Sequence, residues 1–425
     1  MKLILLISAF FLSGAVFAQK TFIQCGKLID VNSGKILTEM TIVIDGQKIS
    51  DVLSGYQSGS KSDKMINLKE KTVLPGLIDS HVHMEFETSR TQFMDRFTSN
   101  SADVAFRASI FANRTLMAGF TTVRDLGGSG VNISLRKAID KGLVVGPHIL
   151  TAGNAISATG GHMDETNGLS EDLFHEELEP KDGVANGKDE LIKAVRFQFK
   201  RGADVIKIAS TGGILDLSKD GSGAQYSVEE IRTVVETAKD YGLKVACHAH
   251  GAEGIKRAIL GGVASIEHGT FIDEEGMELA KKYGTYYVPT IIAGKSVADS
   301  AKIPGYYPPV ISKKAMEIGP KIQNTFAKAY KTGVKIAFGT DAGVYAHGKN
   351  AKEFVYMTEV GMSAMEAIQS ATKNAADLLG ITEYAGSIEK GKIADIIAVD
   401  GDPIKNISLL QNVTFVMKDG QIFKK

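Results

Sequence analysis

Two histidines, His81 and His83, stand one residue apart at the end of an apolar run that begins at Thr72. This run, broken by Pro75-Gly76, predicts a short buried strand, and alternate side chains of a strand point to the same face. The two imidazoles would therefore converge, and neutral imidazole is a common ligand of divalent transition metals. An isolated His-Val-His pair is weak evidence, so other ligands have to come from elsewhere in the chain.

Further polar residues occupy comparable positions. Lys207 lies inside the apolar segment 204–209, where a charged amine is costly unless it is paired or chemically altered. The ends of other apolar segments carry His248, His250, His268 and Asp341. Each alone has an ordinary structural explanation, such as a helix N-cap for Asp341. Their joint occurrence at strand ends predicts one shared metal site.

The elements that must position these side chains alternate along residues 74–383. Short apolar segments predict strands at 72–78, 119–124, 148–152, 204–209, 244–249, 264–267, 286–291 and 335–339. Amphipathic patterns predict helices that include 103–117, 189–201, 227–241, 252–260, 273–283 and 312–331. This α/β alternation indicates a (β/α)8 TIM barrel, whose chemistry sits at the carboxyl ends of the strands. A doubly wound open sheet is the structural alternative.

Both ends of the chain show short alternating strands, at 22–28, 41–45, 394–400 and 413–423. Asp45-Gly46 and Asp419-Gly420 are typical hairpin turns. We predict a small composite β-sandwich domain built from both termini, with residues 19–73 as its first part and 385–425 as its second. The barrel then spans residues 74–384. Two unrelated terminal decorations are the alternative.

The first residues are typical of a secretory signal peptide, predicted to cover 1–18. A basic start at Met1-Lys2, an apolar run over 3–12 and the small-residue site Val16-Phe17-Ala18 give its three regions. No later stretch is long enough to span a bilayer. We expect an exported protein, periplasmic or secreted, without an integral membrane segment after cleavage; an uncleaved anchor is the alternative.

Composition narrows the classes of partner. The 49 Lys and Arg residues balance 49 Asp and Glu residues, which argues against a nucleic-acid or anionic-membrane partner. Two cysteines cannot build a disulfide framework. Since Cys25 and Cys247 fall in different predicted domains, each is expected to be a separate buried thiol.

Taken together, these residues resemble the amidohydrolase superfamily, in the branch with a lysine on the fourth strand. The matching set is His81, His83, Lys207, His248, His268 and Asp341. The segments 158–164, 248–254 and 265–269 look like the group related to imidazolonepropionase and Xaa-Pro dipeptidase, which contains metal-dependent carboxypeptidases. Residues 391–399 are similar to the family's C-terminal strand motif, so the resemblance covers nearly the whole mature chain.

The resemblance implies a binuclear centre of two divalent metal ions, usually Zn2+, bridged by Lys207 as N6-carboxylysine. His81, His83 and Asp341 would hold the more buried metal. His248 and His268 would hold the more exposed one. A hydroxide between the metals would be the nucleophile, and Asp341 the catalytic general acid and base. An uncarboxylated pocket lysine is the alternative.

Three further residues are candidates for substrate binding. His162, in a glycine-rich loop, and His250, two residues beyond His248, could bind a carboxylate or stabilise an oxyanion. Tyr226 could hydrogen-bond a substrate α-carboxylate. For each, an ordinary loop residue is the alternative.

We therefore expect a metal-dependent hydrolase that cleaves amide bonds of small peptides or N-acyl amino acids. An imidazolonepropionase-like cyclic amidase is the first alternative. A deaminase is less favoured, because a bridging lysine suits a binuclear centre. A non-catalytic binding protein on this scaffold would be expected to have lost ligands. The sequence leaves side-chain specificity, metal identity and oligomeric state, including a homo-oligomer, open.

Overall fold

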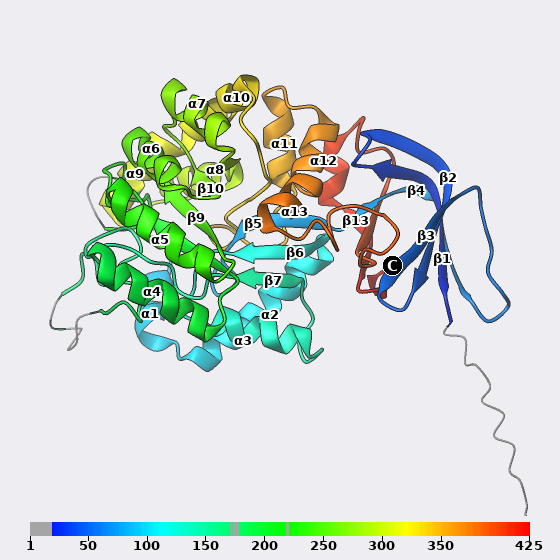
Figure 1. Ribbon diagram of the computed structural model, residues 1–425, viewed down its shortest axis with the longest axis horizontal. Coiled ribbons are helices and arrows are strands. Elements are labelled where there is room, and N and C mark those ends of the chain that lie inside the picture. Colours follow the sequence, from blue (N-terminus) through cyan, green and yellow to red (C-terminus); the bar gives the residue numbers. More distant parts are fainter. Residues whose placement is uncertain (1–18, 171, 173–177, 218–220) are drawn as a thin grey trace, which may run out of the picture.

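A computed structural model of the protein describes residues 19–425 except 171, 173–177 and 218–220 (Figure 1). The predicted signal peptide, residues 1–18, lies outside the described residues. A body of alternating strands and helices fills one end of the molecule, and a β-rich part made from both chain ends fills the other (Figure 1). In the described part of the chain, no helix combines the length and apolarity needed to cross a bilayer.

The strands are β1 (Thr21–Asp30), β2 (Lys35–Asp45), β3 (Lys48–Ser54), β4 (Lys64–Pro75), β5 (Leu77–Val82), β6 (Phe120–Asp125), β7 (His148–Thr151), β8 (Val205–Ala209), β9 (Lys244–Ala249), β10 (Ser265–His268), β11 (Tyr286–Val288), β12 (Ile396–Asp400), β13 (Val413–Lys418) and β14 (Gln421–Lys424). The α-helices are α1 (Gln92–Thr98), α2 (Ser101–Met117), α3 (Val131–Asp140), α4 (Gly187–Arg201), α5 (Val228–Asp240), α6 (Ala252–Gly261), α7 (Glu274–Tyr283), α8 (Ile291–Ala301), α9 (Pro309–Ile318), α10 (Ile322–Thr332), α11 (Lys352–Glu359), α12 (Ala364–Ser370) and α13 (Lys373–Leu379). Short 3-10 helices are η2 (Gly319–Lys321) and η3 (Ile407–Gln411).

Local sequence explains why the helices form where they do. At the start of α5, Ser227 Oγ accepts a hydrogen bond from the Glu230 backbone N–H, and the Glu230 carboxylate accepts one from the Ser227 N–H. This reciprocal capping box satisfies two backbone donors at the helix start. Ile231, Val234 and Ala238 then follow at helical spacing and are buried, so one face of α5 packs on the strands. The predicted helix 312–331 is instead divided into α9, η2 and α10 around Gly319-Pro320, because proline lacks the N–H that a continuous helix needs.

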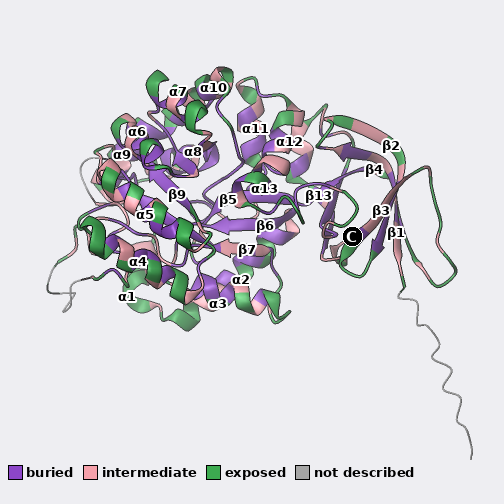
Figure 2. Cartoon of the chain, in the orientation of Figure 1, coloured by how far each residue is buried: buried purple, intermediate pink, exposed green. Residues whose placement is uncertain are grey.

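The parallel strands of the α/β body form two sheets. β5, β6 and β7 make a three-stranded sheet, and β8 to β11 make a four-stranded one. An isolated parallel bridge between Ile156 and Ile208 links the two sheets on one side. These strands are buried and the helices around them present exposed residues outward (Figure 2), as expected for a helix-covered parallel sheet.

The predicted strand 335–339 does not form a regular strand, so among the residues that the structure describes the sheets do not form a closed barrel. Its backbone nevertheless bonds to both neighbouring strands: the Tyr287 N–H donates to the Lys335 carbonyl, and the Ser80 N–H donates to the Phe338 carbonyl. Parallel bridges join Tyr287 to Ile336 and Val82 to Ala342. The segment makes isolated bridges in place of a regular ladder.

The two chain ends meet in one seven-stranded sheet, in the order β14-β13-β12-β4-β1-β2-β3. β12 pairs antiparallel with β4, with Ala398 opposite Val73, and buried side chains that include Ile23 and Phe415 form its core. The predicted composite of both termini is thus present as a sheet. A sandwich of two stacked sheets is not confirmed, because all these strands belong to one sheet that curls until Lys48, the first residue of β3, bridges to Ile393. The domain limits at residues 73 and 384 stay predictions.

Both cysteines are free and buried, Cys25 in β1 and Cys247 in β9. Burial raises the pKa of each thiol to about 12, so both stay protonated at neutral pH.

Candidate metal centre and substrate cavity

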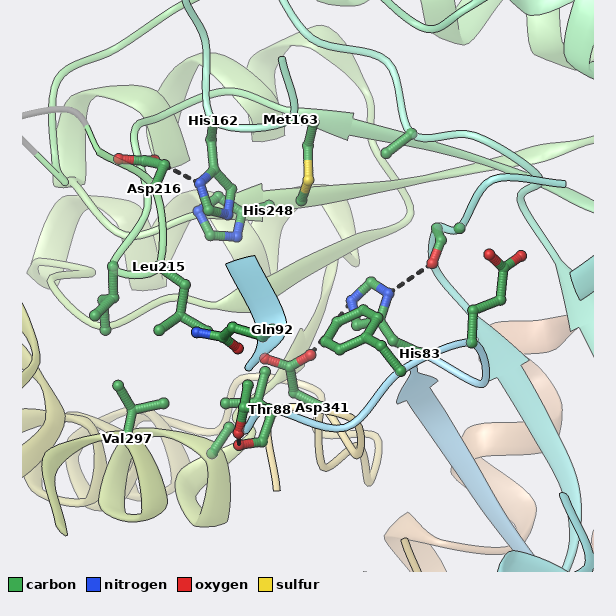
Figure 3. Close-up of a pocket in the computed structure, with 18 of the residues that line it drawn as sticks. His83, Thr88, Gln92, His162, Met163, Leu215, Asp216, His248, Val297 and Asp341 are labelled. Carbon is green, nitrogen blue, oxygen red and sulfur yellow. Dashed lines mark hydrogen bonds and ion pairs between the residues drawn. The ribbon is translucent and has the colours of Figure 1, made fainter. Parts of the chain in front are cut away.

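Polar side chains from the carboxyl ends of several strands line one cavity of about 670 Å³. β5 leads to the first pair of histidines, β8 carries the lysine, and β9 and β10 end in the others. The residues that line the cavity include all of the predicted metal ligands, namely His81, His83, Lys207, His248, His268 and Asp341. Figure 3 shows part of this wall, with His83, Asp341 and His248 facing the cavity. The structure therefore brings together residues that span more than half of the chain.

The tightest group within this set is His81, His83 and Asp341. Asp341 Oδ1 lies 3.4 Å from His81 Nε2 and 3.3 Å from His83 Nε2, and the candidate ligand atoms all lie within 4.8 Å of one another. Burial lowers the pKa of His83 to about 3, with a further contribution from the charge of Lys207, and burial lowers the pKa of His81 well below its usual range. Both rings are therefore neutral at pH 7, which is the form that binds metal.

Three atoms of this region are buried without a hydrogen-bond partner among the described residues: His81 Nε2, Lys207 Nζ and Asp341 Oδ1. An unsatisfied buried polar atom costs about 1–3 kcal/mol, and more when it is charged. Two of these atoms, His81 Nε2 and Asp341 Oδ1, can bind a cation directly, and the Lys207 amine would do so only after conversion to a carbamate, whose oxygens are metal ligands. Burial lowers the pKa of Lys207, because the ammonium is separated from water.

The remaining rings complete the set. The ring centroids of His248 and His268 are 4.7 Å apart, and those of His81 and His268 are 5.0 Å apart. His268 Nδ1 is 2.8 Å from Thr290 Oγ1, and His248 Nε2 is 3.1 Å from the Gly212 carbonyl oxygen. One nitrogen of each ring is thus fixed by the protein and the other is left for a ligand, the usual arrangement of metal-binding histidines.

Strained backbone marks the same place. His268, Thr290 and Asp341 have φ values of 70°, 51° and 60°, in the left-handed region. Such a conformation costs on the order of 1–3 kcal/mol for a residue other than glycine and persists only where surrounding contacts impose it. This backbone conformation turns His268, at the end of β10, and Asp341 toward the cavity.

Sequence reasoning did not assign a role to Glu267, although it stands next to His268. Its carboxylate is fully buried, and Oε2 lies 2.9 Å from His81 Nδ1. The other oxygen accepts from Arg124 Nη2 at 2.9 Å. A carboxylate on the far nitrogen of a ligating histidine fixes the ring orientation and raises its basicity. A glutamate inside a buried strand needs a charged partner, and this pattern could have identified Glu267 from the sequence.

Asp79 performs a similar structural task for Asp341. Its Oδ1 accepts from the backbone N–H groups of His81 and Thr340, at 3.1 Å each. Its Oδ2 accepts from Thr340 Oγ1 at 2.6 Å and from Asn350 Nδ2 at 2.8 Å. Burial raises the pKa of Asp79 to about 6 despite these bonds. Asp79 therefore ties the end of β5 to the residue just before Asp341.

The three predicted substrate residues do not all reach the cavity. His162 and His250 line it; His162 Nδ1 is 2.6 Å from Asp216 Oδ2, and His250 Nδ1 is 2.8 Å from Thr270 Oγ1. Tyr226 is placed elsewhere: it is 2 % exposed, packs in the main core and donates its hydroxyl to the Ala185 carbonyl at 2.9 Å. It directly precedes the cap of α5, where a large apolar ring packs against the first turns of the helix.

Residues 72–423 match the model of the amidohydrolase family. The chain belongs to the amidohydrolase family. This finding confirms the superfamily expected from the ligand set.

Several relatives of this amidohydrolase are known by sequence or structure. A Xaa-Pro dipeptidase whose crystal structure has methionine bound in the active site is 52% identical in sequence to this protein. The structural match covers 96% of this chain and 100% of the dipeptidase chain, with a TM-score of 0.93. A prolidase complexed with N-methylphosphonate-L-proline is 31% identical, covers 96% of this chain and 100% of that chain, and has a TM-score of 0.87. Ochratoxinase from Aspergillus niger is 32% identical over 436 residues, which is 96% of this chain and 87% of that protein.

These relatives establish the class of reaction. The protein is a hydrolytic enzyme that acts on C–N bonds of amides. Its candidate ligand set lies where the family's α/β architecture places chemistry, at the carboxyl ends of parallel strands.

Proposed function

We propose that this amidohydrolase cleaves the amide bond of dipeptides or N-acyl amino acids at a two-metal centre. The observation that carries the proposal is the convergence of His81 Nε2, Lys207 Nζ and Asp341 Oδ1, buried and without hydrogen-bond partners among the described residues, on one cavity. The names of the relatives support the substrate class, since a Xaa-Pro dipeptidase and a prolidase act on short peptides.

The donor set suits two divalent ions, and zinc binds both imidazole and carboxylate ligands. His81, His83 and Asp341 would hold one ion, and His248 and His268 the other. Lys207, after its amine adds carbon dioxide to give N6-carboxylysine, would be a further ligand shared by the two ions. When bound, the ions would polarise the scissile carbonyl and lower the pKa of the attacking water.

The protein's own groups then handle the proton and the substrate. Asp341 Oδ1 faces the two histidines, which leaves Oδ2 to take the proton of the attacking water and return it to the leaving amine nitrogen. Burial raises the pKa of Asp341 to about 8, and the nearby carboxylates of Asp79 and Glu267 raise it further. His162 and His250 would bind the substrate's carboxylate or its developing oxyanion from the cavity wall.

The scaffold proposed for this chemistry is a closed (β/α)8 barrel. Residues 335–342 would complete it between β11 and β5, supported by the backbone bonds and bridges that this segment makes to both strands. Export to the periplasm or the medium is a further proposal. It rests on the sequence of residues 1–18 alone.

The test combines metal content with substrate cleavage. Elemental analysis of the mature protein should find about two zinc ions per chain, and a dipeptide library that varies the C-terminal residue should be cleaved. Lys207→Ala should lose both metal and turnover, whereas Lys302→Ala, at an exposed surface lysine, should lose neither.

Two outcomes would contradict the proposal. One metal or none in the wild type, together with an unaffected Lys207→Ala variant, would refute the bridging role of the lysine. Ring opening of an imidazolone without any peptide cleavage would favour the cyclic amidase alternative.

A further inference from the structure

His162 Nδ1 is held by a charged pair from two other elements. Asp216, which follows β8, places its Oδ2 2.6 Å from His162 Nδ1 (Figure 3). The other oxygen of Asp216 accepts a hydrogen bond from Lys314 Nζ at 2.8 Å. Lys314 belongs to α9, so three elements that are remote in sequence meet at this ring.

The pair is buried. The side chains of Lys314 and Asp216 are 6% and 8% exposed, and a buried ammonium is stable only where its charge and its N–H groups are matched. Lys314 Nζ also donates to the Gly213 carbonyl at 2.8 Å and to the Asp216 carbonyl at 2.9 Å. All three of its N–H bonds therefore end on the segment 213–216, which they fix against α9.

That segment is shaped around the imidazole. The Gly213 N–H donates to Asp216 Oδ2 at 3.0 Å, and a Cβ at Gly213 would lie 1.9 Å from Cε1 of His162. Only glycine leaves room for the ring here. On its other face the ring stacks on His248, with centroids 4.1 Å apart and planes 28° apart.

His162 is thus confined between a glycine backbone and a candidate metal ligand, and its Nδ1 is engaged by a carboxylate. A carboxylate partner holds the ring proton on Nδ1 and fixes the ring orientation. Nε2 is then the nitrogen left for a ligand in the cavity that His162 lines.

We propose that Asp216, clamped by Lys314, is a positioning residue that holds His162 in the orientation needed to bind the substrate. The inference deepens the proposed function and rests on it. Asp216 lines the same cavity, but its two carboxylate oxygens are engaged by His162 and Lys314, so it acts through His162 and not by contact with the scissile bond. Loss of its carboxylate should weaken substrate binding more than it slows the chemical step.

A double-mutant cycle separates this role from a merely structural one. The variants are Asp216→Ala, His162→Gln and their combination, measured for KM and kcat with the best dipeptide and for the Kd of free L-methionine by calorimetry. Asp216→Ala should raise KM and Kd about tenfold or more, the loss expected for a hydrogen bond to a charged group. Because Asp216 acts through His162, the combined variant should be no worse than His162→Gln alone.

Two controls keep the cycle interpretable. Asp216→Ala leaves the Lys314 ammonium buried without its carboxylate, so Asp216→Ala/Lys314→Met removes both charges and should fold if the single variant does not. Asp204→Asn removes a carboxylate at the amino end of β8, where it pairs with Arg136, and should leave KM and Kd unchanged. Metal content should stay at the wild-type value in every variant.

The outcomes divide clearly. A multiplicative loss in the combined variant, or an unchanged KM and Kd in Asp216→Ala, overturns the positioning role. Wild-type protein that binds L-methionine but cleaves neither a dipeptide nor an N-acyl amino acid refutes the proposed function, while the Kd cycle still tests the inference. Absence of both binding and cleavage overturns both.

Discussion

Replacing Glu267 by glutamine tests whether the buried charge behind His81 shapes the metal centre. Glu267 is fully buried and bonds at 2.9 Å to both His81 Nδ1 and Arg124 Nη2. Removing one partner of a buried ion pair costs about 3–5 kcal/mol. The lower end applies here, because Arg124 keeps its bonds to the Ser80 carbonyl and to Ser265 Oγ at 2.6 and 3.1 Å. We therefore expect a loss of about 3 kcal/mol in the free energy of unfolding.

The same change should weaken metal binding about 10- to 100-fold, because the ring of His81 loses its carboxylate partner. Urea unfolding of the chelated protein measures the first effect, and competition with a chelating dye measures the second. In Glu267→Gln/Arg124→Met, which removes both charges, stability should recover while the metal defect persists. Glu278→Gln, at an exposed glutamate on α7, is the matched control.

Two results would refute this reasoning. If Glu267→Gln unfolded at the wild-type urea concentration, the buried pair would not stabilise the fold as described. If the double variant bound metal as tightly as the wild type, Glu267 would have no effect on His81 beyond stability.

Three further predictions follow from other features. Burial raises the pKa of Glu353 to about 8 from its ordinary 4.5. Between these pH values the folded state holds more protons than the unfolded state, so the free energy of unfolding falls as pH rises through that window. Glu353→Gln should therefore flatten the pH dependence of the melting temperature. Removal of divalent ions with EDTA should lower the melting temperature and added zinc should restore it, since a ligand that binds only the folded state stabilises it by about 2.7 kcal/mol at 100 times its Kd. Gly26→Ala should destabilise the fold by about 1–3 kcal/mol in thermal unfolding, because the added Cβ would lie 1.8 Å from the Lys69 backbone oxygen. An unchanged melting temperature would contradict that packing.

The sequence predicted the location of the candidate ligands because strand ends are a local property. The apolar run at 244–249 ends next to His248, and the structure has β9 over Lys244–Ala249. Since parallel strands in this architecture end on one side, histidines far apart in sequence could be assigned to one cavity. Lys207 was identifiable because a lysine inside an apolar strand needs an explanation.

What the sequence could not predict depends on contacts between remote residues. Arg124 pairs with Glu267, and Lys314 with Asp216, across chain separations that no local pattern records. Tyr226 was expected near the substrate because it follows a strand end, but its position before the α5 cap turns the ring into the core.

The shared sheet of the two chain ends bears on the order of folding during synthesis. β4 pairs with β12 only after about 320 more residues have been made, since Pro75 lies opposite Ile396. At about 5–20 residues per second, ribosomes need on the order of 16–60 s for that length. Until then β4 would present an unpaired edge, a site at which nascent chains can associate. β4, which directly precedes the strand that carries His81, would thus lack one of its two neighbouring strands until the C-terminal segment has been made.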